Sequence, residues 1–282
     1  MSKAIPIILV IIIIGAIISA AYYETHMTNT KTHTSTTTTI TQHTVILYVL
    51  SGAGLMKPMN ELIQQFQQKY HVKVIVDYGG SGEIFAKLKT GEGEVFVPGS
   101  YYYAAQAIKD KFIIPSTLVN ITKHIPVIAV PVNNPENIHS LKDLLKPGFK
   151  IAIGDPKACA IGKVAYKIFK KNGLWNMFEE KMKRGEVVLA PTVNQLLLYL
   201  VTGQVKAAII WEDLATWSQA HGKIKIIEIP ANQNIIKTIP AAVTVYAEKN
   251  GKLKIAEEFV EYISSSQGLK IWEKWGFKPW HP

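Results

Sequence analysis

The chain has 282 residues, of which 48% are hydrophobic and 18% charged, and this is ample for one or two folded domains. Its net charge of +10 comes almost wholly from lysine, because Arg184 is the only arginine. A basic surface of this kind attracts small anions, but without arginine clusters among aromatics we expect no nucleic-acid binding. Cys159 is the only cysteine and no histidine pair has zinc-binding spacing, so the sequence predicts no disulfide and no metal or other cofactor.

The N-terminus predicts a route to the membrane. Lys3 precedes an uncharged apolar run over 4–23, long enough to span a bilayer. We interpret residues 1–27 as a signal or membrane anchor with the remainder outside the cell. The threonine-rich residues 28–44 cannot build a core and predict an extended stalk, open to O-glycosylation. The sequence therefore predicts a protein on the extracellular face of the membrane, anchored by the apolar segment or released from it.

Two similar turns open the globular part. An apolar strand over 45–50 runs into Ser51-Gly-Ala-Gly and then a helix-spaced apolar pattern to Tyr70. A second strand over 72–76 runs into Gly79-Gly-Ser-Gly, which encloses Ser81, and then another helix. Helix-start amides carry partial positive charge, and glycine lets a ligand approach the backbone, so each turn suits an anion. An ordinary capped turn explains one copy equally well; two copies favour a shared anion site.

Strands and helices alternate through the remaining chain, which predicts α/β layers with a largely parallel sheet. In such sheets ligands bind at the carboxyl ends of the strands, where the two serine turns lie. The further expected strands cover 94–97, 125–132, 150–153, 187–189 and 207–211, and the further expected helices begin near 101, 140, 160 and 194.

Short motifs in the same order resemble the periplasmic molybdate-binding proteins of ABC importers, within the wider family of solute-binding proteins. The resemblance covers nearly all of residues 45–282. The motifs that carry it are Ser51–Leu55, Gly79–Glu83, Glu94–Val97, Ser140–Leu144, Ile151–Lys157, Ile239–Val243 and the stretch Ala256–Phe277.

The resemblance implies a two-lobed periplasmic-binding-protein fold with a hinge and an oxyanion in the cleft. The first lobe would comprise 45–123 with 230–282, and the second 124–229. The protein would be a monomer and no enzyme, without catalytic residues. It would deliver its anion to an ABC permease and that permease's ATPase.

Five ligand residues are implied by the same resemblance. Ser51 and Ser81 match the family's hydroxyl ligands, and Val193 matches a backbone amide. A further amide falls at Ile161, with Ala160 as the alternative, because this segment departs from the family's pattern. The family's ligand tyrosine is replaced by Trp211, whose indole N–H is also a donor.

Several of these residues have a simpler structural explanation than ligand binding. Trp211 ends an apolar strand, where a core role outweighs a ligand role by roughly two to one. Val193 suits any helix start, and Cys159 suits a small packed residue. We expect Glu212 and Asp213 to be solvated; the alternative is an expanded coordination sphere, as in the related archaeal tungstate-binding proteins.

A fully ionised tetrahedral anion offers only acceptors, so a site made only of donors suits molybdate or tungstate. Each charge-assisted hydrogen bond contributes about 1.5–3 kcal/mol. The alternatives are the same fold with sulfate, thiosulfate or phosphate, an adhesion domain using the tail aromatics, and a serine hydrolase. The last is disfavoured because Glu83 breaks the G-x-S-x-G pattern around Ser81.

Overall fold

The computed structural model describes residues 44–280, which belong to one compact unit. The predicted anchor and almost all of the predicted stalk lie outside the described residues. Within 44–280, no helix combines the length and the apolar composition needed to cross a bilayer. The account below concerns this unit.

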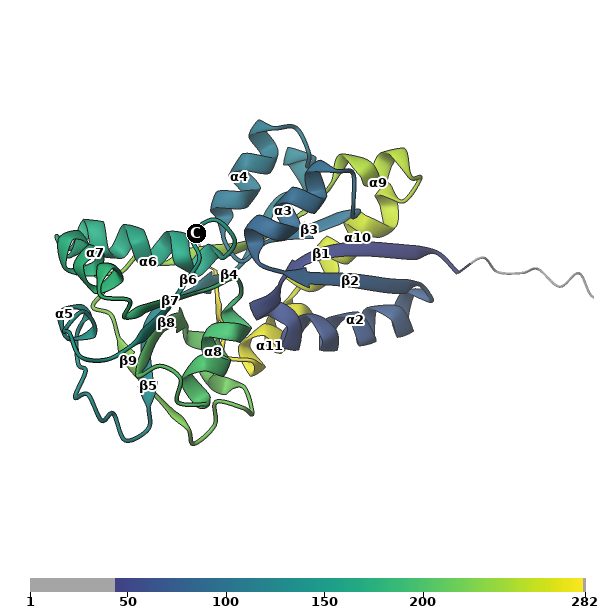
Figure 1. Cartoon of the computed structure of the whole chain (residues 1–282). Helices are drawn as coiled ribbons and strands as arrows, with labels where there is room; N and C mark the ends of the chain where they lie inside the picture. Colours follow the sequence, from purple (N-terminus) through teal and green to yellow (C-terminus); the bar gives the residue numbers. More distant parts are fainter. Residues whose placement is uncertain (1–43, 281–282) are drawn as a thin grey trace, which may run out of the picture. The chain divides into compact units, whose positions relative to one another are not determined.

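The first sheet has six strands in the order β11-β4-β10-β3-β1-β2 (Figure 1). β1 pairs in parallel with β2 and with β3, whereas β10, β4 and β11 pair antiparallel. The strands are β1 Ile46–Gly52, β2 Lys73–Gly79, β3 Val95–Val97, β4 Val119–His124, β10 Lys237–Val243 and β11 Lys278–Pro279.

The second sheet has five strands in the order β7-β6-β8-β5-β9. β6 pairs in parallel with β7 and β8, and β5 pairs antiparallel with β8 and β9. The strands are β5 Pro126–Pro131, β6 Ile151–Gly154, β7 Val187–Ala190, β8 Ala207–Trp211 and β9 Ile224–Glu228.

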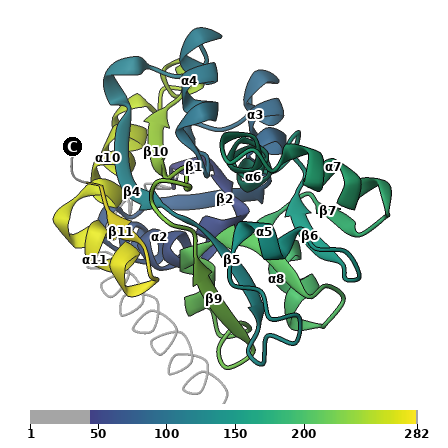
Figure 2. The same ribbon diagram turned by 90° about the vertical axis from the view of Figure 1, so that its left-hand side faces the viewer.

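The prediction of a largely parallel sheet is wrong, because both sheets are mixed. The chain passes from β4 to β5 across Ile125 alone, and returns through residues 229–236 to β10. In each sheet the strand that leads to one crossing pairs with the strand that follows or precedes the other, so the chain runs in opposite directions in β4 and β10 and in β5 and β9. Figure 2 shows β4 leading into β5 where the chain leaves the first sheet.

Helices cover the sheets and define two hydrophobic cores. Leu47 and Val49 on one face of β1 pack in the same cluster as Leu62 and Phe66 of α2. Leu50 belongs instead to a cluster that continues through α3 into the second sheet. The helices are α2 Met56–Tyr70, α3 Ser81–Lys89, α4 Tyr101–Lys109, α5 Leu141–Leu144, α6 Ala160–Lys171, α7 Trp175–Lys183, α8 Val193–Val201, α9 Val245–Lys249, α10 Leu253–Ser264 and α11 Ser266–Lys274, with 3-10 turns η1 Ala53–Leu55, η2 Pro115–Thr117 and η3 Glu212–Thr216.

The two sheets are held in a closed arrangement. The amide of Gly82, in α3 beside the first sheet, donates to the carbonyl oxygen of Ala158 in the second lobe at 2.8 Å. The hydroxyl of Thr216 donates to the carbonyl oxygen of Trp275 at 3.0 Å on another side of the interface. The predicted lobe boundaries lie beside the crossings, with the first falling one residue before β4 ends.

Candidate functional site

A small cavity lies where four helix beginnings meet, two from each lobe. The starts of η1–α2 and α3 come from the first lobe, and those of α6 and α8 from the second. Its volume, counted as the space open to the centre of a water molecule, is about 20 Å³. The lining residues are Gly52, Ala53, Gly54, Leu55, Gly79, Gly80, Ser81, Gly99, His124, Cys159, Ala160, Thr192, Val193 and Trp211.

The chemistry of this inner cavity favours an anion. The first amides of a helix have no partner within it, and the helix dipole adds partial positive charge there. Four helix N-termini therefore direct partial positive charge toward this one cavity. Among the lining residues just named none is lysine, arginine, aspartate or glutamate, so the cavity offers hydrogen-bond donors rather than a counter-ion.

The two predicted serines lie at the carboxyl ends of adjacent strands. Ser51 lies in β1 one residue before that strand ends and is fully buried, and its hydroxyl has no hydrogen-bond partner within the described part of the chain. Leaving a buried hydroxyl unpaired costs about 1–3 kcal/mol. Its neighbour Gly52 lines the cavity, but Ser51 itself is behind that wall.

Ser81 lines the cavity directly and is the first residue of α3. The N-cap of α3 is Gly80, the residue before Ser81. The Ser81 oxygen accepts a hydrogen bond from the amide of Gly99 at 3.0 Å. Since that bond uses an oxygen lone pair, the hydroxyl hydrogen of Ser81 stays free to donate to a ligand.

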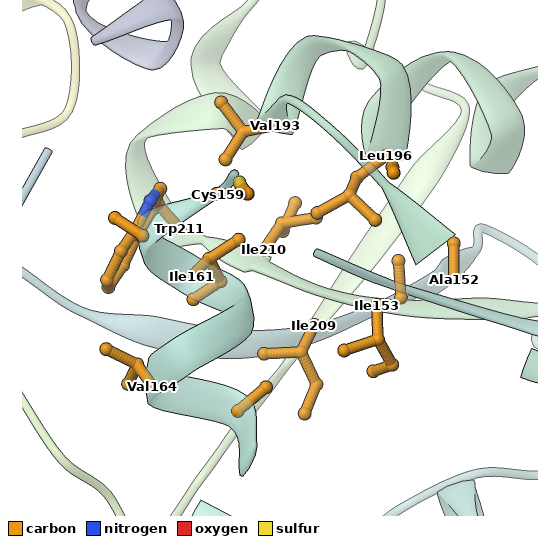
Figure 3. Close-up of a cluster of buried hydrophobic side chains, with 14 of the residues drawn as sticks. Ala152, Ile153, Cys159, Ile161, Val164, Val193, Leu196, Ile209, Ile210 and Trp211 are labelled. Carbon is orange, nitrogen blue, oxygen red and sulfur yellow. The ribbon is translucent and has the colours of Figure 1, made fainter. Parts of the chain in front are cut away.

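The beginning of α6 carries the two backbone amides that the sequence left open, those of Ala160 and Ile161. Ala160 and Cys159 line the cavity, whereas the Ile161 side chain is fully buried in the core of the second lobe (Figure 3). Burial raises the pKa of Cys159 to about 12, despite opposing contributions from the amides of Ile161 and Gly162. Cys159 is therefore a packed, unreactive thiol, and Ala160 is the lining residue at this helix start.

Val193 and Trp211 line the same inner cavity. Val193 is the first residue of α8, whose N-cap Thr192 accepts from the amide of Gln195. Trp211 ends β8 and is 1% exposed, so it is both a core residue and part of the cavity wall. Figure 3 shows both at one end of the cluster formed by the second lobe's apolar side chains.

Three comparisons place this geometry among known proteins. A family described as bacterial extracellular solute-binding proteins matches residues 47–278. The chain belongs to this family. A Haemophilus influenzae relative, named only as a binding protein, is 34% identical over 86% of this chain and 94% of its own length.

Two solved structures share the solute-binding fold. The periplasmic molybdate-binding protein of Azotobacter vinelandii has a TM-score of 0.70 at 19% identity, covering 84% of this chain and 99% of its own. The sulfate-binding protein of Mycobacterium tuberculosis has a TM-score of 0.72 at 19% identity, covering 84% and 88%. Both likenesses show the fold of this solute-binding protein, which is the periplasmic-binding-protein fold of two mixed α/β sheets.

A buried histidine–aspartate couple in this solute-binding protein was missed by sequence reasoning. His124, 1% exposed, lines the cavity, and its Nδ1 lies 2.8 Å from the carbonyl oxygen of Gly99. Its Nε2 lies 3.3 Å from Oδ1 of Asp213, which is 3% exposed. The expectation that Asp213 is solvated is wrong, since η3 turns it inward; Glu212 instead pairs with Lys278 at 2.9 Å.

The electrostatics of this couple follow from its burial. Desolvation raises the pKa of Asp213, against the lowering effect of His124. Oδ2 of Asp213 has no hydrogen-bond partner, which disfavours the ionised carboxylate further. The couple lies beside the anion-favouring cavity, so its protonation state sets the local charge. Within residues 44–280 no group of three or more histidine, cysteine, aspartate or glutamate side chains could hold a metal ion.

Glycines allow the lobes to close over the cavity. A Cβ built on Gly80 would lie 2.5 Å from the carbonyl oxygen of Ala158 and 2.6 Å from that of Pro191. A Cβ on Gly82 would overlap the carbonyl oxygen of Lys157, and one on Gly54 would meet the Val193 side chain at 2.8 Å. The sequence predicted close approach of these glycines to a ligand; in the structure they approach the opposite lobe.

Proposed function

We propose that this solute-binding protein captures a small tetrahedral dianion, molybdate or tungstate, between its lobes. The observation that carries the proposal is the small cavity at four helix beginnings, with Ser81 on its wall and the unpartnered Ser51 hydroxyl behind it. The ligand set is Ser51, Ser81, Val193, Trp211 and the amides at the start of α6, including Ile161 or Ala160.

Size and charge support this solute class. The inner cavity offers about 20 Å³ to the centre of a water molecule, and a single water needs about 10–15 Å³ by the same measure. It therefore holds only a compact inorganic group, not a sugar or an amino acid. A dianion without protons needs donors alone, and hydroxyls and amides supply them. A protonated phosphate needs an acceptor as well, and the cavity wall contains no carboxylate.

The biological setting of the proposal is import. The protein would hold the anion outside the cytoplasm, close around it, and present the closed form to an ABC permease with its ATPase. A ligand that contacts both lobes stabilises the closed state because it interacts less well with either lobe alone. We further propose a monomer tethered to the membrane through residues 1–27, or released from it.

Sulfate or thiosulfate is the alternative solute, because a site of donors suits any unprotonated dianion. Trp211 is the residue whose reach would select between them, since it replaces a hydroxyl donor by a larger indole. A serine hydrolase has less support: Ser81 accepts from the amide of Gly99, and both ring nitrogens of His124 face groups other than Ser81.

Calorimetric titration of the purified full-length protein with molybdate, tungstate, sulfate and phosphate tests the proposal. We expect tight binding of the first two, and a loss of about 10- to 100-fold for each serine replaced in Ser51→Ala and Ser81→Ala. The matched control is Ser116→Ala/Ser218→Ala, which removes two exposed hydroxyls. Tight sulfate binding without a molybdate response would replace the solute. Absence of heat with every oxyanion, from folded protein, would reject the function.

A further inference from the structure

A second cavity lies at the seam between the lobes, adjoining the inner cavity. The two cavities share Ala160, and Ser100 in the second follows Gly99 in the first. The second cavity has about 160 Å³ open to the centre of a water molecule. This seam cavity is lined by Ser100, Tyr101, Tyr102, Tyr103, Ala160, Lys163, Val164, Lys167 and Lys237.

Three lysines bring positive charge to this cavity from two elements. Lys163 and Lys167 lie on α6, and Lys237 begins β10. Among the ion pairs of the described residues, none involves any of the three. Burial lowers the pKa of Lys237, and the charge of Lys167 lowers it further. The ammonium groups of Lys167 and Lys237 therefore repel each other across the cavity.

Aromatic rings hold the two α6 lysines in place without neutralising them. The Lys163 Nζ lies 5.0 Å from the centre of the Tyr102 ring, and the Lys167 Nζ lies 5.6 Å from the same centre. A cation over a ring face gains modest electrostatic energy, yet its full charge remains. Tyr102 belongs to α4 in the first lobe, so the lysines reach across the seam.

A buried hydroxyl gives the second, independent indication of a ligand. Tyr103 is 3% exposed and lines the seam cavity, and its hydroxyl has no hydrogen-bond partner among residues 44–280. Burial raises the pKa of Tyr103, so the phenol remains an O–H donor. An unpaired donor beside three cations without counter-charges is the arrangement an anionic oxygen would complete.

We propose that the seam cavity is a second anion site, which takes a small inorganic oxyanion such as phosphate. Its ligands are the ammonium groups of Lys163, Lys167 and Lys237 and the hydroxyl of Tyr103. An anion in this position accepts bonds from α4 of the first lobe and α6 of the second. Its binding stabilises the closed arrangement, because the lysines approach the tyrosines only when the lobes meet. Occupancy therefore raises the affinity of the inner cavity rather than competing with it.

Lysine acetylation followed by mass spectrometry tests the site directly. The full-length protein is labelled in inorganic phosphate, and separately in chloride of equal ionic strength. We expect phosphate to protect Lys163, Lys167 and Lys237 several-fold while leaving Lys109 and Lys170 unchanged. The latter two are exposed on α4 and α6 and do not line the cavity. Equal labelling of all five lysines in both salts would overturn the proposal.

Variants supply a second measurement. Lys163→Gln/Lys167→Gln should abolish the protection of Lys237 by phosphate. Tyr103→Phe removes the hydroxyl but no charge, and should weaken this protection several-fold. The control Lys109→Gln/Lys170→Gln removes the same number of charges, one from α4 and one from α6, and phosphate should protect Lys237 in it as in the wild type. Persistent protection in Lys163→Gln/Lys167→Gln would also overturn the site. Because no molybdate is present, the result holds whether or not the inner cavity binds molybdate.

Discussion

His124 stacks on Trp211, with ring centroids 3.6 Å apart and an interplanar angle of 17°. His124 ends β4 of the first sheet, and Trp211 ends β8 of the second. The stack thus joins the two lobes at the hinge side of the inner cavity, which both residues line.

Replacing Trp211 separates its role as a wall from its role as a donor. Trp211→Phe keeps an aromatic ring over His124 but removes the indole N–H. If that N–H bonds the anion, affinity falls about 10-fold or more, as expected for one charge-assisted hydrogen bond. Trp211→Tyr restores a donor and should recover most of the loss. Titration calorimetry measures both, and unchanged affinity in Trp211→Phe would leave Trp211 as a wall only.

Asp213 should make anion binding dependent on pH. Burial raises the pKa of this carboxyl above its ordinary value of 3.8. Below the raised pKa the carboxyl is neutral, and above it a negative charge lies beside the cavity and repels a dianion. The dissociation constant of the wild type should therefore rise as pH increases through that pKa. Asp213→Asn should remove this rise, whereas Asp110→Asn, on the surface, should retain it.

The free energy of unfolding should also fall as pH rises through the pKa of Asp213, as the anion affinity does. A carboxyl with a raised pKa in the folded state binds more protons there than in the unfolded state. Its contribution is fully present below the unfolded pKa, and it is lost as pH rises through the folded pKa. The melting temperature of Asp213→Asn, minus that of the wild type, should thus increase with pH. A constant difference between pH 4 and 8 would contradict the raised pKa.

Local patterns were enough to predict the strand–turn–helix units that carry Ser51, Ser81 and Val193, because each unit is contiguous. They were also enough to predict Trp211 at the end of a buried strand. The His124–Asp213 couple was missed because His124 ends β4 of the first sheet whereas Asp213 lies in η3, just after β8 of the second sheet, and only the crossings between the sheets bring them together. The antiparallel strands were missed for the same reason. A buried strand ending in a lone histidine was the one available signal.

Lys181 should anchor the second lobe. Its side chain is fully buried, and its Nζ donates to the carbonyl oxygens of Lys146 and Phe149 at 2.5 and 2.8 Å. Lys181→Met leaves these acceptors unpaired and should lower the free energy of unfolding by about 2–3 kcal/mol. The control Lys183→Met changes an exposed lysine on the same helix and should cost little. Urea unfolding of both variants measures the two losses in free energy of unfolding, and equal losses would contradict the anchoring role of Lys181.

The contribution of Lys181 to the free energy of unfolding should change with pH in the opposite direction to that of Asp213. Burial lowers the pKa of Lys181 below its ordinary value of 10.5. Between the lowered pKa and 10.5 the unfolded chain binds more protons, so wild-type stability should rise with pH in that window. The Lys181→Met variant lacks this group and should show less of the rise. An equal rise in both proteins would contradict the assignment.

Gly82 should be essential for closure rather than for folding. A Cβ there would overlap the backbone carbonyl oxygen of Lys157 in the opposite lobe, and the amide of Gly82 bonds to Ala158. Gly82→Ala should therefore weaken anion binding at least 10-fold, while alanine's better helix propensity keeps the anion-free melting temperature near that of the wild type. Because the clash is with backbone, adding Lys157→Ala should not restore affinity. Small-angle scattering should show the wild type compacting on anion addition and Gly82→Ala remaining extended; normal compaction in Gly82→Ala would mean that the lobes close without this contact.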